Sequence, residues 1–287
     1  MHSVEDDTPE RELPTLLAAA TRRLAAAGVA SPRVDAELLA SHVLSVPRGR
    51  LPVVRALTPE QASLFESLVA RRAARVPLQH LTGEAPFYGL SFAVGPGVFI
   101  PRFETELLVE WALRQPAFRV VDLCSGSGAI AVAFAANRPS ATVVAVERSP
   151  AALPWLRRNV AALAPAVSVV EGDVTDFSIL SDVDGLVDLV LCNPPYVPIS
   201  APVDVEVRDH DPASAVFAGA DGLALMPGIA ARAAALLRPG GLLAIEHDDT
   251  QGESLPALLR GFPFADVVDH ADLAGRPRFT TARRVAD

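Results

Sequence analysis

Residues 118–131 read FRVVDLCSGSGAIA, an apolar run that leads into a glycine-containing loop. The run predicts a buried β-strand, and the apolar residues after the loop predict a helix. Gly126 and Gly128 would let backbone N–H groups approach a ligand at the N-terminus of that helix. This strand–loop–helix unit therefore predicts an α/β domain with a ligand site at the carboxyl end of the strand.

Apolar strands and helices alternate along the chain after this unit. The expected strands are ATVVAVE, VSVVEGD, VDLVLC and GLLAIEH, and the expected helices are GAIAVAFAAN, AALPWLRRNVAAL and GLALMPGIAARAAALL. This alternation predicts a parallel sheet covered by helices on both faces. The tail FADVVDHADLAGRPRFTTARR has two strand-like runs joined by a turn, so we expect the sheet to finish with an antiparallel pair.

The chain before the sheet divides into a helical part and a linker. Residues 13–76 predict helices, one starting with Ser31 as cap and Pro32, and another with a Thr58–Gln61 capping box. The next stretch is rich in Gly, Pro and aromatic residues with alternating apolar positions, which predicts a β-hairpin. We therefore expect a helical domain over 1–76, a hairpin linker over 77–101 and an α/β domain over 102–287.

Composition excludes several classes of protein. The chain has 287 residues, half of them hydrophobic, and a net charge of -9, which disfavours a protein that mainly neutralises phosphates or anionic lipids. The acidic N-terminal MHSVEDDTPEREL is not a secretory signal, and no apolar run approaches a membrane span. We expect a soluble cytoplasmic monomer without a membrane or stable nucleic-acid partner.

Two cysteines, Cys124 and Cys192, follow or end predicted buried strands. In that setting a reduced thiol behaves as a small hydrophobe, so we expect no structural disulfide. Two cysteines also supply too few ligands for a metal site.

The glycine loop alone leaves two cofactors open. Gly126, Gly128 and Ala131 satisfy the dinucleotide fingerprint, and Glu147 ends the next strand about 20 residues on, where an acid binds ribose hydroxyls. Asp122 favours S-adenosyl-L-methionine over NAD. A carboxylate there would repel a pyrophosphate but suits ammonium and sulfonium charges, although Asp122 could also be a merely structural residue at the strand end.

Two later acids extend the predicted cofactor site. Glu147 could accept hydrogen bonds from both ribose hydroxyls, although it could also serve only as a helix start. Asp173, expected to end a third strand, and Val174 would lie near the adenine, although Asp173 could also be an ordinary loop acid.

The fourth strand ends in an unusual tetrapeptide within VDLVLCNPPYV, residues 187–197. The two prolines hold Asn193 and Pro194 out of helical geometry, so their backbone carbonyls project. The Asn193 side chain adds an acceptor and Tyr196 an aromatic face, which together could hold a planar NH₂ group. The pattern indicates an amide or aromatic amine as substrate, although Asn-Pro-Pro is also a plain strand stop.

At this point the sequence resembles the family of glutamine methyltransferases that modify peptide chain release factors. The segments that carry the resemblance are PLQHLTGEAPFYGLSFAVGPGVFIPRFETELLVE (77–110), VVDLCSGSGAIA (120–131), NPPY (193–196), DGLALMPGIA and DLAGRPRF. NPPY is shared with nucleic-acid amine methyltransferases, whereas the hairpin followed by IPRFETE is far more specific.

The resemblance implies a seven-stranded Rossmann-like class I methyltransferase sheet and methylation of the amide nitrogen of the glutamine in the Gly-Gly-Gln motif of class I release factors. It implies S-adenosyl-L-methionine as cofactor, with S-adenosyl-L-homocysteine as product, and a helical domain that recognises the release factor. The cofactor-binding residues would be Asp122, Cys124, Ser125, Gly126, Ser127, Gly128, Glu147, Asp173, Val174 and Asn193. The substrate-binding residues would be Asn193, Pro194, Pro195 and Tyr196, of which Asn193, Pro194 and Tyr196 would be catalytic.

Several positions depart from the family pattern. Cys124 replaces the first glycine of the loop, Phe103 replaces a proline, Val174 replaces a larger aromatic residue, and HDDTQ (247–251) replaces a glycine-containing stretch. Two alternative functions for the chain stay open. One is a nucleic-acid adenine or guanine amino methyltransferase, which would need a basic surface. The other is a non-catalytic protein that binds release factors.

Overall fold

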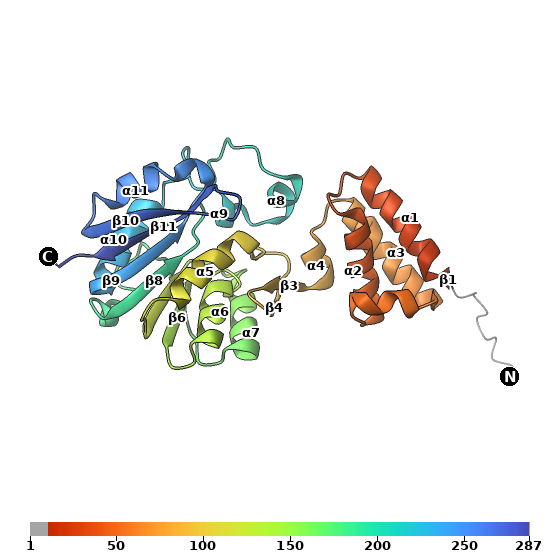
Figure 1. The fold of residues 1–287 in the computed structure, drawn as a ribbon, viewed down its shortest axis with the longest axis horizontal. Helices are drawn as coiled ribbons and strands as arrows, with labels where there is room; N and C mark the ends of the chain where they lie inside the picture. The colour runs from red at the N-terminus through yellow and green to blue at the C-terminus, as the bar shows by residue number, and fades with distance from the viewer. Residues whose placement is uncertain (1–10, 287) are drawn as a thin grey trace. The chain divides into compact units, whose positions relative to one another are not determined.

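The computed structural model describes residues 11–286 (Figure 1). Most of the N-terminal segment on which the absence of a secretory signal was predicted lies outside these residues. The chain forms two compact units, Met1–Gly83 and Glu84–Asp287. No helix among residues 11–286 is both long and apolar enough to cross a membrane.

The first unit is a small helical bundle. It contains α1 (Leu13–Ala26), α2 (Pro32–Leu44), α3 (Pro59–Ala73), the short α4 (Leu78–Thr82), a 3₁₀ turn (Arg48–Val53) and the paired strands β1 (Arg11–Glu12) and β2 (Ala56–Leu57). Apolar side chains of the helices form its core, among them Leu24, Leu39 and Phe65. A buried ion pair, in which Arg72 Nε lies 2.7 Å from Asp35 Oδ2, joins α3 to α2.

The predicted helix starts are largely confirmed. Thr58 accepts from the Gln61 N–H, and the Gln61 side chain accepts from the Thr58 N–H, which completes the capping box of α3. Ser31 occupies the N-cap position of α2, but its side chain makes no capping hydrogen bond. Pro32, with its fixed φ, is therefore the sequence feature that starts α2.

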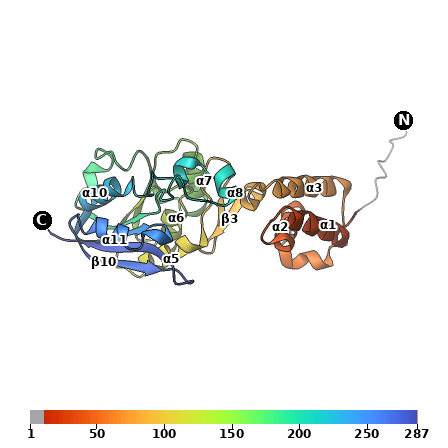
Figure 2. The same ribbon diagram turned by 90° about the horizontal axis from the view of Figure 1, so that it is seen from above.

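The second unit is built on the predicted seven-stranded sheet, with order β10-β11-β9-β8-β5-β6-β7. Its strands are β5 (Arg119–Leu123), β6 (Thr142–Glu147), β7 (Ser168–Glu171), β8 (Val187–Cys192), β9 (Leu237–Glu246), β10 (Phe264–Ala271) and β11 (Pro277–Arg284). The strands from β5 to β9 pair in parallel, whereas β11 pairs antiparallel with both β9 and β10. The view in Figure 2 shows β10 at the edge of this sheet. The expected antiparallel finish is confirmed.

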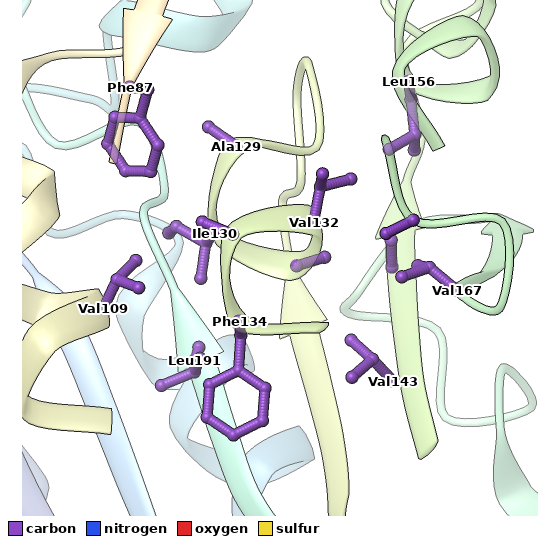
Figure 3. Close-up of a cluster of buried hydrophobic side chains, with 14 of the residues drawn as sticks. Phe87, Val109, Ala129, Ile130, Val132, Phe134, Val143, Leu156, Val167 and Leu191 are labelled. Atoms are coloured by element: carbon purple, nitrogen blue, oxygen red, sulfur yellow. The ribbon is translucent and has the colours of Figure 1, made fainter. Parts of the chain in front are cut away.

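Helices cover both faces of this sheet, as Figure 1 shows. One face packs against α5 (Glu106–Leu113), α6 (Ala129–Asn137) and α7 (Leu153–Leu163), and the other against α10 (Met226–Leu236) and α11 (Ser254–Leu259). Figure 3 shows Ile130 and Phe134 of α6 in the first of these apolar layers, together with Leu191 of β8. Alternate residues of β8 reach opposite layers, so the strand is buried on both sides.

The hairpin of β3 (Glu84–Phe87) and β4 (Leu90–Ala93) belongs to the second unit. Its two-residue turn places Tyr88 and Gly89 at positive φ, which matches the twist of the paired strands. Asn159 of α7 fixes the hairpin. It accepts from the Ala93 N–H at 2.7 Å and donates to the Ala93 carbonyl at 3.0 Å and to the Ser127 carbonyl at 2.9 Å. One buried amide thus joins the hairpin to the glycine loop.

We predict that Asn159→Ala destabilises the second unit by roughly 2 to 4 kcal/mol, because it leaves buried backbone groups without partners. Both tryptophans, Trp111 and Trp155, lie in this unit, so tryptophan fluorescence during urea unfolding measures the change. Asn137→Ala is the matched control, since the Asn137 amide makes one local bond to the Ala133 carbonyl. Equal unfolding midpoints for the two variants would contradict the prediction.

Candidate active site

A cavity of about 320 Å³ lies at the carboxyl edge of the sheet. Its walls come from the loops that follow β5, β6, β7 and β8 and from the segment that precedes α5. All of the predicted site residues line it except Asp122 and Gly128. Those that do are Cys124, Ser125, Gly126, Ser127, Glu147, Asp173, Val174, Asn193, Pro194, Pro195 and Tyr196.

The glycine loop turns sharply between β5 and α6. Cys124, Gly126 and Gly128 have φ values of 62°, 55° and 85°. A Cβ on Gly128 would lie 2.6 Å from Leu156 Cδ1, so this glycine allows close packing of the loop on α7. Cys124 carries a side chain in the left-handed region, which costs about 1–2 kcal/mol. Position 124, where the family pattern has glycine, therefore requires a positive φ in this loop.

Glu147 ends β6 and holds the glycine loop through its carboxylate. Its Oε2 accepts from the Gly126 N–H and its Oε1 from the Ser149 N–H, each at 2.7 Å. Each carboxylate oxygen has further acceptor capacity, and the residue lines the cavity. The side chain thus holds the glycine loop and does not start a helix, since α7 begins at Leu153 with Ala152 at its N-cap position. Ribose binding by Glu147 stays a prediction.

Asp122 lies beneath the loop and is fully buried. Its Oδ2 accepts from the Ala131 N–H at 3.2 Å, and within residues 11–286 its Oδ1 has no hydrogen-bond partner. Burial raises the pKa of Asp122 to about 7, while the neighbouring Ser125 hydroxyl and the hydrogen bond from Ala131 oppose the rise. The carboxyl group therefore supports the start of α6, and its predicted contact with the cofactor stays a prediction.

Asp173 and Val174 follow β7, which ends at Glu171, two residues earlier than predicted. Asp173 Oδ1 accepts from the Thr175 N–H at 2.9 Å, and its Oδ2 accepts from Arg148 at 3.0 Å. The hydrogen bonds from Thr175 lower the pKa of Asp173, so the group is a carboxylate at neutral pH. Val174 is buried against the apolar layer behind it and gives the cavity an apolar wall.

The Asn-Pro-Pro-Tyr segment leaves β8 without helix or strand geometry. Asn193 Nδ2 donates to Thr105 Oγ1 at 3.2 Å, and the Tyr196 hydroxyl donates to Glu246 Oε1 at 3.0 Å. No backbone N–H within residues 11–286 donates to the Pro194 carbonyl. The segment thus keeps a backbone acceptor available while its two polar side chains are anchored.

Gln251 also holds the Asn-Pro-Pro-Tyr segment, through hydrogen bonds to two backbone carbonyls. Its Nε2 donates to the Tyr196 carbonyl at 3.0 Å and to the Asp221 carbonyl at 3.1 Å. Its own position is set by a capping box with Asp248. The stretch 247–251, whose role the sequence left open, therefore supports the Asn-Pro-Pro-Tyr backbone.

Four residues that support the site were missed by the sequence interpretation: Thr105, Glu246, Gln251 and Gly222. Thr105 lies in IPRFETE, Gln251 in HDDTQ and Gly222 in DGLALM, so the segments had been noted but not these side chains.

Both cysteines are free thiols, and burial raises the pKa of Cys192.

Comparison with known proteins matches both units. Residues 15–83 match the family model described as PrmC N-terminal domain, and residues 90–207 match the one described as Methyltransferase small domain. The release factor glutamine methyltransferase of Mycolicibacterium smegmatis is 54% identical over 278 residues, which cover 96% of this chain and 98% of that protein. The chain belongs to the release factor glutamine methyltransferase family.

The chain is also similar to family members from other bacteria. The release factor glutamine methyltransferase of Streptomyces coelicolor is 48% identical over 281 residues, which cover 93% of this chain and 96% of that one. That of Deinococcus radiodurans is 42% identical, with 95% and 99% covered. The resemblance drawn from the hairpin, the glycine loop and Asn-Pro-Pro-Tyr is thus confirmed, as is the seven-stranded methyltransferase fold with a helical N-terminal domain.

We predict that Gly222→Ala destabilises the second unit by roughly 3 kcal/mol, since a side chain there adds both backbone strain and a clash. Gly222 has a φ of 77°, and a Cβ on it would lie 2.0 Å from the Tyr196 carbonyl oxygen. Gly185, with a φ of 71° and nothing within 4 Å of such a Cβ, is the matched control. Its change to Ala should cost only about 1 kcal/mol of strain. Urea unfolding of both variants tests the difference, and equal losses would show that the clash does not matter.

Proposed function

We propose that this member of the family transfers a methyl group from S-adenosyl-L-methionine to the side-chain amide nitrogen of the glutamine in the Gly-Gly-Gln motif of class I release factors. One observation carries the proposal. The anchored Asn193 and the glycine loop line the same cavity, so a planar amide and the methyl donor can meet there.

The residues of the cavity fit the proposed cofactor. A Cβ on Gly126 would meet nothing within 4 Å, so the loop backbone is open to a ligand at this point. The Glu147 carboxylate is available to ribose hydroxyls, and Val174 gives an apolar wall for adenine. When bound, S-adenosyl-L-methionine supplies an electrophilic methyl group on a positively charged sulfur.

The Asn-Pro-Pro-Tyr segment would hold the substrate amide by both of its hydrogens. With its NH₂ engaged by Thr105, Asn193 offers its side-chain oxygen, and Pro194 offers its backbone carbonyl. Accepting both hydrogens orients the nitrogen and increases its electron density. Transfer would form the N–CH₃ bond as the bond between the methyl group and sulfur breaks, with S-adenosyl-L-homocysteine and one proton as the other products. Positioning, rather than a strong base, would be the main contribution of the protein.

We expect the helical domain, residues 1–76 with the hairpin linker over 77–101, to help the α/β domain over 102–287 recognise the release factor. We also expect a cytoplasmic monomer that binds no nucleic acid stably. The net charge of -9 supports a protein substrate over an extended nucleic-acid backbone.

We predict that the purified protein, given methyl-labelled S-adenosyl-L-methionine, labels a class I release factor on the glutamine of Gly-Gly-Gln. Mass spectrometry of the digested release factor locates the added methyl group. A Gly-Gly-Ala version of the same release factor is the control and should stay unlabelled. Label on the Gly-Gly-Ala protein, or on added RNA or DNA instead, would overturn the assignment.

We predict that Asn193→Ala lowers the rate of methyl transfer by about 10²-fold or more, because it removes a preorganised contact to the reacting amide. The affinity for S-adenosyl-L-methionine, measured by calorimetric titration, should change far less. Asn137→Ala removes an exposed asparagine at the end of α6 and should leave the rate unchanged. An Asn193→Ala enzyme with full turnover would show that the residue has no part in the reaction.

A further inference from the structure

Two buried polar side chains contact the Asn-Pro-Pro-Tyr segment: Thr105, which also lines the cavity, and Glu246, which does not. Thr105, which precedes α5, is 3% exposed, and Glu246, the last residue of β9, is 1% exposed. Asn193 donates to Thr105 at 3.2 Å, and Tyr196 donates to Glu246 at 3.0 Å. The two polar ends of the segment are thus anchored by residues from two distant parts of the chain.

The sheet brings Glu246 to this position. Cys192 pairs with Ile245 in the parallel β8–β9 ladder, so the residues that follow them, Asn193 and Glu246, leave the sheet at the same level. A carboxyl group at the end of β9 is therefore held beneath the segment that follows β8. The pairing register of β8 and β9 therefore determines where Glu246 lies.

The charge state of Glu246 depends on the groups around it. Burial raises its pKa to about 7 and the charge of Glu104 adds to the rise, while the neighbouring Thr105 hydroxyl, the hydrogen bond from Tyr196 and the charge of Arg278 on β11 oppose it. Its Oε1 accepts from Tyr196, whereas its Oε2 meets no donor at full hydrogen-bond geometry within residues 11–286. The Thr105 hydroxyl therefore lowers the pKa of this carboxyl group as a neighbour, and no hydrogen bond between the two is present in residues 11–286.

A hydroxyl has a single hydrogen, so the direction of these contacts matters. If the Thr105 hydrogen turns toward the Glu246 carboxylate, only oxygen lone pairs remain for Asn193. Those lone pairs can accept from the Asn193 NH₂ group but would repel its carbonyl oxygen. The amide is then held with its nitrogen toward Thr105 and its oxygen free for the substrate.

We propose that Thr105 and Glu246 are positioning residues that fix which end of the Asn193 amide faces the substrate and thereby select glutamine over glutamate. A substrate amide donates its two N–H groups to the Asn193 oxygen and the Pro194 carbonyl. A substrate carboxylate has no hydrogen to donate and would face acceptors only. The identity of the substrate rests on the proposed function, whereas the orientation of Asn193 does not.

The test uses two substitutions at Thr105 and a matched control at Thr280. Thr105→Val removes the hydroxyl and keeps the shape, and Thr105→Ser keeps the hydroxyl. Thr280 on β11 is also fully buried, and its hydroxyl has no hydrogen-bond partner within residues 11–286, so Thr280→Val makes the same chemical change away from Asn193. Comparing the two valine variants separates loss of positioning from loss of a buried hydroxyl in general.

With a Gly-Gly-Gln release factor, kcat of Thr105→Val should fall about tenfold or more, while Thr105→Ser and Thr280→Val stay within about twofold of the original protein. The Kd for S-adenosyl-L-methionine should be unchanged in all three. In binding assays, the preference for Gly-Gly-Gln over Gly-Gly-Glu peptides should shrink about tenfold in Thr105→Val alone. Equal behaviour of Thr105→Val and Thr280→Val would overturn the proposal.

A second measurement does not depend on the substrate. The side-chain NH₂ of Asn193 gives NMR signals in the ¹⁵N-labelled protein, assigned by their loss in Asn193→Ala. These signals should shift in Thr105→Val and in Glu246→Gln but not in Thr280→Val. A protein that fails to methylate release factors would overturn the proposed function, and the NMR comparison would still support or overturn the orientation of Asn193.

Discussion

The parallel pairing of β5 with β8 is the constraint on which the rest of the site depends. The chain runs from β5 through β6 to β7 on one side of the sheet and returns to place β8 on the other side of β5. Their register aligns Leu123 with Cys192, so the glycine loop and Asn193 leave the sheet next to each other. Ligand crevices of α/β sheets form where strand order reverses in this way.

Two buried carboxyl groups support this edge at some cost to stability. Asp122 and Glu246 are almost fully removed from solvent, and burial raises the pKa of each to about 7. Each folded-state pKa lies above the ordinary value of its side chain, so the stability they contribute is present at low pH and is lost as pH rises through about 7. At neutral pH these two acids therefore hold the backbone and side chains around the cavity in place but lower the free energy of unfolding.

The sequence revealed those parts of the site that are contiguous in the chain. The glycine loop and the Asn-Pro-Pro-Tyr segment each carry their own local signal, because glycine and proline constrain the backbone directly. Thr105 lies 88 residues from Asn193, and Glu246 lies 50 residues from Tyr196. Their contacts depend on strand order and register, which no local pattern contains, and a lone threonine or strand-end glutamate carries no signal of its own.

Contacts from neighbouring elements allow the loop to carry Cys124 where the family pattern has glycine. A left-handed residue with a side chain persists only where its surroundings fix it. Here Glu147 holds the Gly126 N–H and Asn159 holds the Ser127 carbonyl, so the loop is fixed from two neighbouring elements. The Cys124 side chain packs against the apolar layer under the sheet, and this burial offsets part of the strain. The loop conformation is therefore imposed by the sheet and α7, and glycine at position 124 would only make it less costly to adopt.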